Sequence, residues 1–458
     1  MAGEPGEIAA TSTLNRGPAG KPLQDRAEHT GLDVAELNRI ESLSAKCLGA
    51  GTVGNVLEWY DFGLYGFLAP LIGAHFFPSS SPIASLLGAY GGFAIGFAMR
   101  PVGGVLLGHV GDRLGRRAVL ILSIVMMGVA TTLIGVLPTY RQVGIWAPVL
   151  LVAVRLFQGL SVGGEFTGSV SYLIETAPSR WRGFAGSFAN IGSEGGYILA
   201  SALAATTVIL LRHHSEAPWI WRLPFLGGGV LACLAWLLVR RLSRAGYEPD
   251  QRKDVQHELP LKQAFKESPR ALILIMVFTW GYGVLNYLTL VFLPTFASKF
   301  GGIDAGDALT INSALQLAAL LLIPVSGWLT DRFIRRRVLL LAVFALVCLT
   351  SVTFFEMAGG NLARFGVAQG SLIVLLFLVE GTAPAMLAEQ FSSRYRVSGY
   401  SVAFNIGIGL GGGTAPLIAT ALIAPLGKLA GAGYLVVCAL LSFAALYLMT
   451  DRSREPLS

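Results

Sequence analysis

Acidic residues stand inside long apolar stretches of this sequence, where an ionised side chain is costly unless it has a partner or a wet cavity. Glu58 and Asp61 are three residues apart and would share one face of a helix. Two carboxylates this close cannot both ionise cheaply, so one of them is suited to carry a proton. All 6 histidines lie in loops or at predicted helix ends. We therefore expect a carboxylate to carry the proton, with Asp61 preferred and Glu58 second.

Arginines stand in the neighbouring apolar stretches. Arg100 is expected at a depth similar to that of Glu58 and Asp61, where it could pair with them and be released to a substrate when they are protonated. Arg155 and Glu165 lie at different heights of one predicted helix. They either handle substrate and protons or form a brace that only holds helices together. Because arginine binds carboxylates in a bidentate manner, Arg100, Arg155 and Arg222 favour an anionic substrate.

Two further carboxylates, Glu194 and Glu380, lie deep in apolar stretches. They could contact a cationic group on a zwitterion or take part in proton transfer. Uncharged polar groups orient a ligand without a large desolvation cost, although each is as well explained by a hydrogen bond between helices. The predicted substrate-binding residues are Arg100, Arg155, Tyr60, Tyr90, Glu194, Gln316, Asn286, Glu380 and Asn405.

Two charged patterns occur once in each half of the chain. The pattern G-x-x-x-D-R-x-G-R-R begins at Gly108 and recurs in weaker form from Gly327, and a glutamate precedes an R-x-R triplet in both halves. The aspartates in these patterns could cap a helix end or pair with the arginines. Such ion pairs would hold the cytoplasmic side closed and would break when two helix bundles rotate relative to each other. The alternative is that the arginines only fix membrane topology. The predicted gate residues are Gly108, Asp112, Arg113, Gly115, Arg116, Asp331, Arg332, Glu175, Arg182, Glu389 and Arg396.

The composition predicts that a bilayer surrounds these charges. The chain has 458 residues, of which 53% are hydrophobic and only 13% are charged, about half the charged share of a soluble protein. The basic residues form short clusters between apolar stretches, which membrane topology explains better than nucleic-acid binding. The 4 cysteines lie far apart and have no metal-ligand spacing.

Twelve apolar stretches are long enough to span a bilayer as helices. The basic clusters alternate sides, so both termini and the central loop are expected in the cytoplasm. The sequence predicts an all-α membrane protein with two six-helix bundles. Its expected parts are a cytoplasmic tail (1–45), the first bundle (46–239), a cytoplasmic central loop (240–270), the second bundle (271–449) and a short cytoplasmic tail (450–458).

Several strings narrow the family. They are the string from Gly54 to Phe62, Arg100-Pro101-Val-Gly103-Gly104, and the string from Arg155 to Glu165. With the charged loop pattern, they resemble the metabolite:H⁺ symporter family of the major facilitator superfamily. The resemblance implies a twelve-helix fold and proton symport of a small-molecule substrate in a bacterial inner membrane. It also implies a role for Arg155 in proton or substrate handling. We expect a monomer in contact with lipid, with no nucleic-acid partner and no cofactor beyond the proton.

The substrate class stays open at this point. The main hypothesis is uptake of a di- or tricarboxylate, and the alternative is uptake of a zwitterion such as proline or betaine. A drug:H⁺ antiporter is less favoured because the segment from Gly192 to Gly196 lacks the proline of its helix-5 signature. A membrane receptor would need an added soluble domain. No nucleophile elbow, phosphate loop or metal cluster supports an enzyme.

Overall fold

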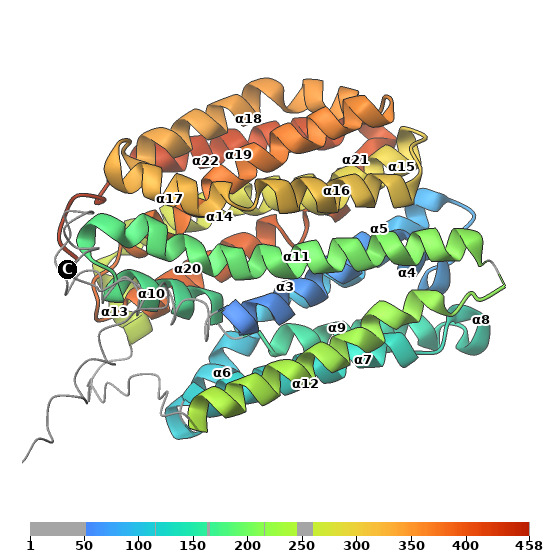
Figure 1. Ribbon diagram of the computed structural model, residues 1–458, viewed down its shortest axis with the longest axis horizontal. Helices are drawn as coiled ribbons and strands as arrows, with labels where there is room; N and C mark the ends of the chain where they lie inside the picture. The colour runs from blue at the N-terminus through green and yellow to red at the C-terminus, as the bar shows by residue number, and fades with distance from the viewer. Residues whose placement is uncertain (1–51, 115, 163–164, 215, 245–259, 458) are drawn as a thin grey trace, which may run out of the picture.

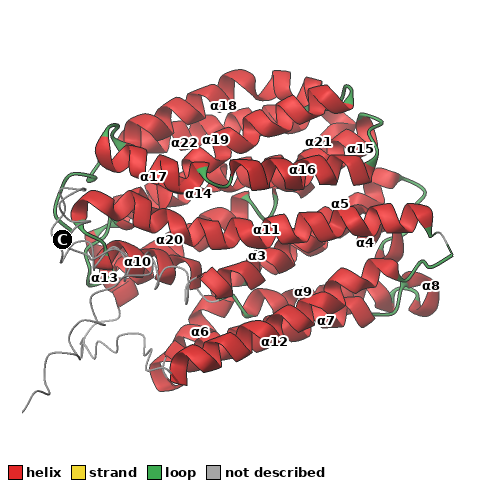
Figure 2. Ribbon diagram, in the orientation of Figure 1, coloured by secondary structure: helices red, strands yellow, loops and turns green. Residues whose placement is uncertain are grey.

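The computed structural model describes residues 52–457, except 115, 163–164, 215 and 245–259. Throughout the described part the chain is helical, with short connecting loops (Figure 2). In the first half the helices are α3 (Thr52–Phe67), α4 (Ala69–Phe76), α5 (Pro82–Ala98), α6 (Arg100–Leu114), α7 (Arg116–Val136), α8 (Tyr140–Val143), α9 (Trp146–Leu160), α10 (Glu165–Thr176), α11 (Arg182–His213) and α12 (Leu223–Arg244).

The second half repeats this organisation. Its helices are α13 (Pro260–Glu267), α14 (Pro269–Tyr287), a π-helical turn (Leu288–Phe292), α15 (Leu293–Phe300), α16 (Ala305–Ala319), α17 (Leu322–Arg332), α18 (Arg336–Ala358), α19 (Leu362–Ala388), α20 (Arg396–Gly411), α21 (Ala415–Leu426) and α22 (Ala430–Leu448). The short helix α13 lies within the segment expected to be a loop.

Ten described helices are long and apolar enough to cross a membrane. The two remaining predicted spans are each divided. The first consists of α3 and α4, which meet at Leu68, and the fourth consists of α9 and α10. A break of this kind is tolerated at membrane depth where neighbouring helices surround it. Three of the ten apolar spans are divided as well, between α5 and α6, between α16 and α17, and between α20 and α21, so several of the twelve predicted spans are interrupted helices.

Helix α11 is the main contact between the two halves. It runs the length of the molecule, next to α3 on one side and to α16, α17 and α19 on the other (Figure 1). Along the middle of the helix, its contacts with the second half include Asn190, Tyr197 and Ser201, with Glu194 between them. These positions recur every three or four residues, so they lie on one face of the helix. On its other face, a Cβ at Gly196 would collide with the Val56 carbonyl oxygen, so glycine lets α3 approach closely.

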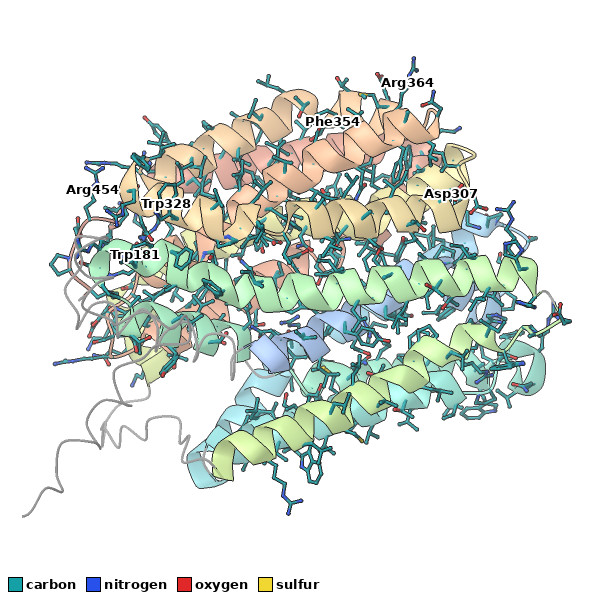
Figure 3. All side chains as sticks on the ribbon, in the orientation of Figure 1. Trp181, Asp307, Trp328, Phe354, Arg364 and Arg454 are labelled. Carbon is teal, nitrogen blue, oxygen red and sulfur yellow. The ribbon has the colours of Figure 1, made fainter. Side chains whose placement is uncertain are left out.

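Polar and aromatic side chains that Figure 3 labels locate the two ends of the molecule. Arg454 and Trp181 lie at one end, and Asp307 and Arg364 lie at the other (Figure 3). We call the first the gate end, because Arg182, Glu389 and Arg396 also lie there, and the second the opposite end. Exposed apolar side chains such as Leu349 and Val230 cover the sides between the ends, as expected for a surface in contact with lipid.

Candidate functional site

Asp61 is fully buried in the first half, inside a polar network drawn from α3, α7 and α9. Its Oδ1 lies 2.6 Å from the Thr131 hydroxyl, and its Oδ2 lies 3.8 Å from Arg155 Nη1. Gln158 extends the network, since it accepts a hydrogen bond from Arg155 at 2.5 Å and donates one to Thr131 at 3.4 Å. Asp61 therefore has a hydroxyl and a guanidinium as partners, and its Oδ2 receives no hydrogen bond within the described residues.

Glycines make room for the Arg155 side chain. Its Nε donates to the Gly92 carbonyl oxygen at 3.4 Å. A Cβ at Gly96 would lie 3.0 Å from Nη2, in the space that the guanidinium fills. The Tyr65 ring lies 4.2 Å from the guanidinium carbon, a position suited to cation–π attraction. Arg155 thus connects Asp61 on α3 with α5, where the sequence alone indicated no partner other than Glu165.

Glu58 and Arg100 form a second buried ion pair. Arg100 Nη2 donates to Glu58 Oε1 at 2.6 Å, as expected from their similar depth. Arg100 Nε donates to Asn405 Oδ1 at 3.3 Å. Asn405 lies on α20, in the second half of the chain, so the pair touches both halves. Three rings, those of Trp59, Phe62 and Phe97, lie within 5.7 Å of the guanidinium carbon.

The remaining predicted binding residues lie in different surroundings. The Tyr60 hydroxyl donates to the Pro224 carbonyl oxygen at 2.6 Å and is thus used inside the first half. Tyr90 and Gln316 are fully buried, and neither atom of the Gln316 amide has a partner within the described residues. The Glu165 side chain lies outside the described residues. Arg222 donates to the carbonyl oxygens of Gly135 and Leu137, which removes it from the set of ligand-binding arginines.

Glu194 and Glu380 meet between the two halves. They lie on α11 and α19, and their carboxyl groups are within hydrogen-bonding reach of each other. Asn286 Nδ2 donates to Glu380 Oε1 at 3.1 Å, and the Asn190 amide donates to the Glu380 carbonyl oxygen at 2.6 Å. The Tyr197 hydroxyl donates to Asn286 Oδ1 at 3.4 Å. The sequence identified Glu194, Glu380 and Asn286 separately, and folding brings them together.

The gate glutamates pair across the two halves. Arg396 donates to Glu175 at 2.7 Å, and Arg182 lies 3.5 Å from Glu389. Each glutamate thus pairs with an arginine of the other half, not with the arginine that follows it in sequence. Glu389 also pairs with Arg336, a residue that we did not predict for the gate. The sequence feature that could have identified Arg336 is its position in the repeated D-R-x-x-R-R string.

Asp331 caps a helix of the first half. Its two carboxylate oxygens accept hydrogen bonds from the backbone amides of Gly183 and Phe184, both at 2.8 Å. A carboxylate is favoured there because unpaired amides and the helix dipole make the start of α11 positive. Asp331 also pairs with Arg336 at 2.7 Å, whereas its neighbour Arg332 lies over the Trp181 ring. Five predicted gate residues cannot be placed in this way. Gly115 lies outside the described residues, and so do the side chains of Asp112, Arg113 and Arg116 and the surroundings of Gly108.

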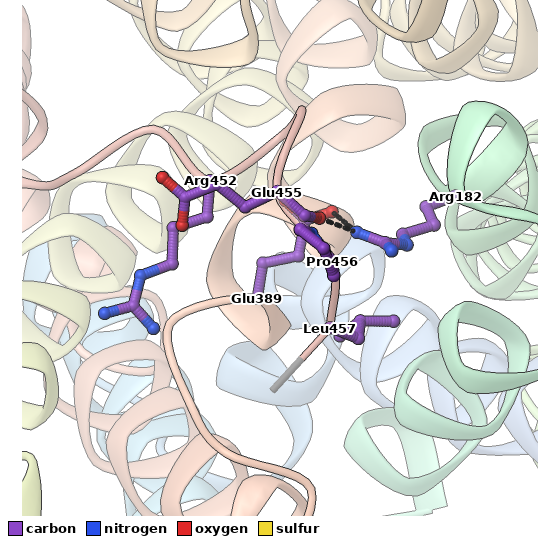
Figure 4. A pocket seen from close by; sticks show the side chains of 6 residues that line it. All are labelled: Arg182, Glu389, Arg452, Glu455, Pro456 and Leu457. Atoms are coloured by element: carbon purple, nitrogen blue, oxygen red, sulfur yellow. Dashed lines mark hydrogen bonds and ion pairs between the residues drawn. The ribbon is translucent and has the colours of Figure 1, made fainter.

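The segment after α22 folds over these ion pairs (Figure 4). The Glu455 carbonyl oxygen accepts a hydrogen bond from Arg182 at 2.9 Å, beside a cavity of about 340 Å³. Burial alone would raise the pKa of Asp451, but hydrogen bonds from Ser453 and the Arg337 amide hold this pKa below its ordinary value. The charged Asp451 anchors the segment next to the gate.

At the opposite end the two halves meet through uncharged groups. The Ser201 hydroxyl accepts from Asn312 Nδ2 at 3.0 Å and lies 2.8 Å from the Ser313 hydroxyl. A cavity of about 280 Å³ opens nearby, lined by Phe67, Leu71 and Pro294 among others. One ion pair also joins the two halves there, Arg212 with Asp304 at 3.5 Å, and it is exposed.

Comparison with known proteins gives a consistent result. A model of the Major Facilitator Superfamily matches residues 51–381. A Staphylococcus aureus protein named for proline and betaine is 32% identical over 413 residues, which is 89% of this chain and 88% of that protein. The proline/betaine transporter of Escherichia coli is 30% identical over 422 residues, covering 90% of this chain and 84% of that protein.

Solved structures share the fold. The crystal structure of a D-xylose–proton symporter superposes with a TM-score of 0.65 at 16% identity, covering 92% of this chain and 100% of that one. An inward-facing bacterial homologue of the human lysosomal transporter Spinster gives 0.61 at 16% identity, covering 91% and 99%. These matches and the ten apolar helices identify a multi-pass membrane protein.

Proposed function

Because the chain belongs to the major facilitator superfamily of membrane transporters, we propose that it takes up a small zwitterion together with protons. The names of its relatives favour proline- or betaine-like substrates over the organic acid that the sequence first favoured. The zwitterion hypothesis thus replaces the carboxylate hypothesis.

The balance of buried charge carries this proposal. From the sequence, Arg100 and Arg155 favoured an anionic substrate, but in the structure each arginine lies beside an acidic residue of helix α3. Arg100 lies against Glu58, and Arg155 lies beside Asp61. Glu194 and Glu380 add two more buried carboxyl groups. Among the described groups at the centre, acids therefore outnumber bases, so a di- or tricarboxylate would meet too little positive charge to offset its desolvation. A zwitterion brings one charge of each sign and fits this balance.

Asp61 is the proposed proton carrier. A proton on Asp61 would remove the negative charge beside Arg155, whose other partners are the neutral Gln158 and Gly92 carbonyls. Thr131 can follow this change, because its hydroxyl lies 2.8 Å from the Met127 carbonyl oxygen as well as 2.6 Å from Asp61. Proton binding would therefore shift hydrogen bonds among α3, α7 and α9, three of the helices of the first bundle.

The Arg100 site is proposed to bind the substrate carboxylate. Arg100 is held by Glu58 from its own bundle and touches Asn405 in the other. If Glu58 takes up a proton, Arg100 can exchange this partner for a substrate carboxylate, which it binds with two parallel hydrogen bonds. A ligand in this position would contact both bundles, as alternating access requires. We propose further that the gate end and both termini face the cytoplasm.

Uptake into proteoliposomes tests the proposal. The purified chain should accumulate labelled betaine or proline under an imposed inward proton gradient, and it should prefer them to citrate, α-ketoglutarate and shikimate. Uptake that ignores pH and survives an uncoupler would overturn proton symport, and preference for citrate would restore the organic-acid hypothesis.

Asp61→Asn should abolish accumulation. One charge crossing 100 mV releases about 2.3 kcal/mol, equivalent to a concentration ratio of about 50. In the variant, the substrate concentration inside the vesicles should rise only to the concentration outside, while exchange of substrate across the membrane persists. Asp307→Asn, at an exposed position of α16, is the matched control and should accumulate substrate normally. Full accumulation by Asp61→Asn would remove Asp61 from the mechanism.

A further inference from the structure

We propose that Glu194 and Glu380 share one proton and together bind the positively charged end of the substrate, an ammonium or quaternary ammonium group. This inference rests on the proposed function and deepens it, since it assigns the half of the zwitterion that Arg100 cannot bind.

The pair is a built site between the two bundles. Both side chains are only 1% exposed. Their carboxyl groups lie within hydrogen-bonding reach of each other, one from α11 and one from α19. Asn286 donates to Glu380 Oε1, and the Tyr282 hydroxyl is also within hydrogen-bonding reach of that carboxyl group. The Oε2 atoms of both glutamates receive no hydrogen bond from the described residues. Two buried acceptor atoms thus remain available at one place.

Charge is unbalanced at this place. The titratable groups that face the pair are Tyr197 and Tyr282, which are neutral phenols at ordinary pH, and Tyr287 and Tyr400 interact in turn with these tyrosines. None of the ion pairs among the described residues involves Glu194 or Glu380, unlike Glu58 and Asp61. Two touching carboxylates repel strongly in a medium of low dielectric constant, so the pair retains one proton and one negative charge. A ligand with a single positive charge would neutralise the one negative charge that remains on the pair.

Aromatic rings extend the site toward Arg100. The Tyr287 ring centroid lies 6.2 Å from that of Tyr197 and 5.3 Å from that of Phe97. The Arg100 guanidinium carbon in turn lies 5.2 Å from the Phe97 ring. Tyrosine faces attract ammonium and quaternary ammonium groups. The acid pair and the arginine therefore border the same aromatic layer from two sides, and the Tyr287 and Tyr197 hydroxyl groups lie within hydrogen-bonding reach of each other.

The position of the pair also explains how a bound cation would be released. Glu194 belongs to the first bundle and Glu380 to the second, and the two helices touch directly. When the bundles separate on one side, the two carboxyl groups part, and a cation held between them loses one of its two ligands. The same motion that opens the site thus weakens binding.

Competition experiments separate the charge from the shape of the substrate. Glycine betaine and 3,3-dimethylbutanoate differ mainly in a charged nitrogen that is replaced by carbon. Wild-type proteoliposomes should bind betaine more tightly. The double variant E194Q/E380Q should lose about 30-fold in betaine affinity, the size expected for loss of a buried contact to a charged group, with no loss for 3,3-dimethylbutanoate. Glu356→Gln, at an exposed position of α18, is the matched control.

The single variants test the shared proton even if the double variant does not fold. In E194Q or E380Q the glutamine amide can donate the hydrogen bond that the shared proton made, so one negative charge remains and betaine binding should survive. The infrared carbonyl band of the protonated carboxyl group should disappear in each single variant, because the remaining carboxyl group is ionised. Persistence of that band in either variant would overturn the shared proton.

The outcomes distinguish the two proposals. A wild-type protein that takes up neither betaine nor proline overturns the proposed function, and the ligand assigned here with it. A wild-type protein that transports betaine, with a double variant that still prefers betaine as strongly, overturns this inference alone.

Discussion

The two ends of the molecule hold the bundles together by different chemistry. At the gate end, charges cross the interface: buried Arg182 with buried Glu389, exposed Glu175 with buried Arg396, and Asp331 with the amides that begin α11. At the opposite end, the contacts come from the hydroxyl groups of Ser201 and Ser313 and from the Asn312 amide. The cavity of about 280 Å³ adjoins these weaker contacts.

This difference shows which end should open first. Hydrogen bonds between polar side chains of membrane helices contribute about 0.6 kcal/mol each. Removing one partner of a buried ion pair costs about 3–5 kcal/mol, because the other charge is left unpaired. The gate end is therefore closed by strong contacts that depend on one another, and the opposite end by weak contacts that can break singly. From this state we expect a substrate to enter at the opposite end.

The largest expected effect is from Glu389→Gln, since Glu389 contacts both Arg182 and Arg336. The change leaves two buried guanidinium groups short of a counter-charge, so the closed gate should lose about 3–5 kcal/mol. Distances between spin labels at Ser179→Cys and Ser393→Cys, exposed positions of the two halves, should lengthen. A distance distribution identical to that of the background protein would show that these ion pairs do not hold the gate.

A smaller effect is expected from Asp331→Asn. Asparagine keeps one oxygen for the amides of Gly183 and Phe184 but loses the charge that favours a helix start and pairs with Arg336. The expected cost is about 1–2 kcal/mol. Hydrogen exchange of a peptide that includes these two amides should accelerate. Unchanged protection would mean that the cap contributes nothing to closure.

The smallest effect is expected at the opposite end, from Ser201→Ala. Loss of its hydroxyl removes hydrogen bonds worth about 0.6 kcal/mol each, so labels at Glu216→Cys and Asp307→Cys should show only a modest shift toward the open form. Arg212→Gln is the contrasting variant. Its ion pair with Asp304 is exposed and should contribute less still, and nothing at high salt. A shift as large as that of Glu389→Gln would remove the distinction between the ends.

Local features of the sequence predicted much of the fold and of the gate. Apolar stretches predict spanning helices because backbone groups in lipid must be satisfied within the helix itself. The repeated charged patterns singled out Glu175, Arg182, Glu389 and Arg396, which form ion pairs across the two halves. The helix count needed one kind of refinement, the breaks that divide several of the spans, the first and the fourth among them.

The partner of each charged residue was decided by the tertiary structure. Glu175 pairs with Arg396 in the other half, Asp61 lies beside Thr131 and Arg155, and Glu194 touches Glu380. These contacts join residues far apart in sequence, and they depend on how each helix is rotated about its axis. A helix surrounded by lipid and protein is apolar on most sides, so its hydrophobic pattern does not specify that rotation. The sequence by itself determined where the charges lie along the helices, and close packing at glycines such as Gly96 and Gly196 decided which of them meet.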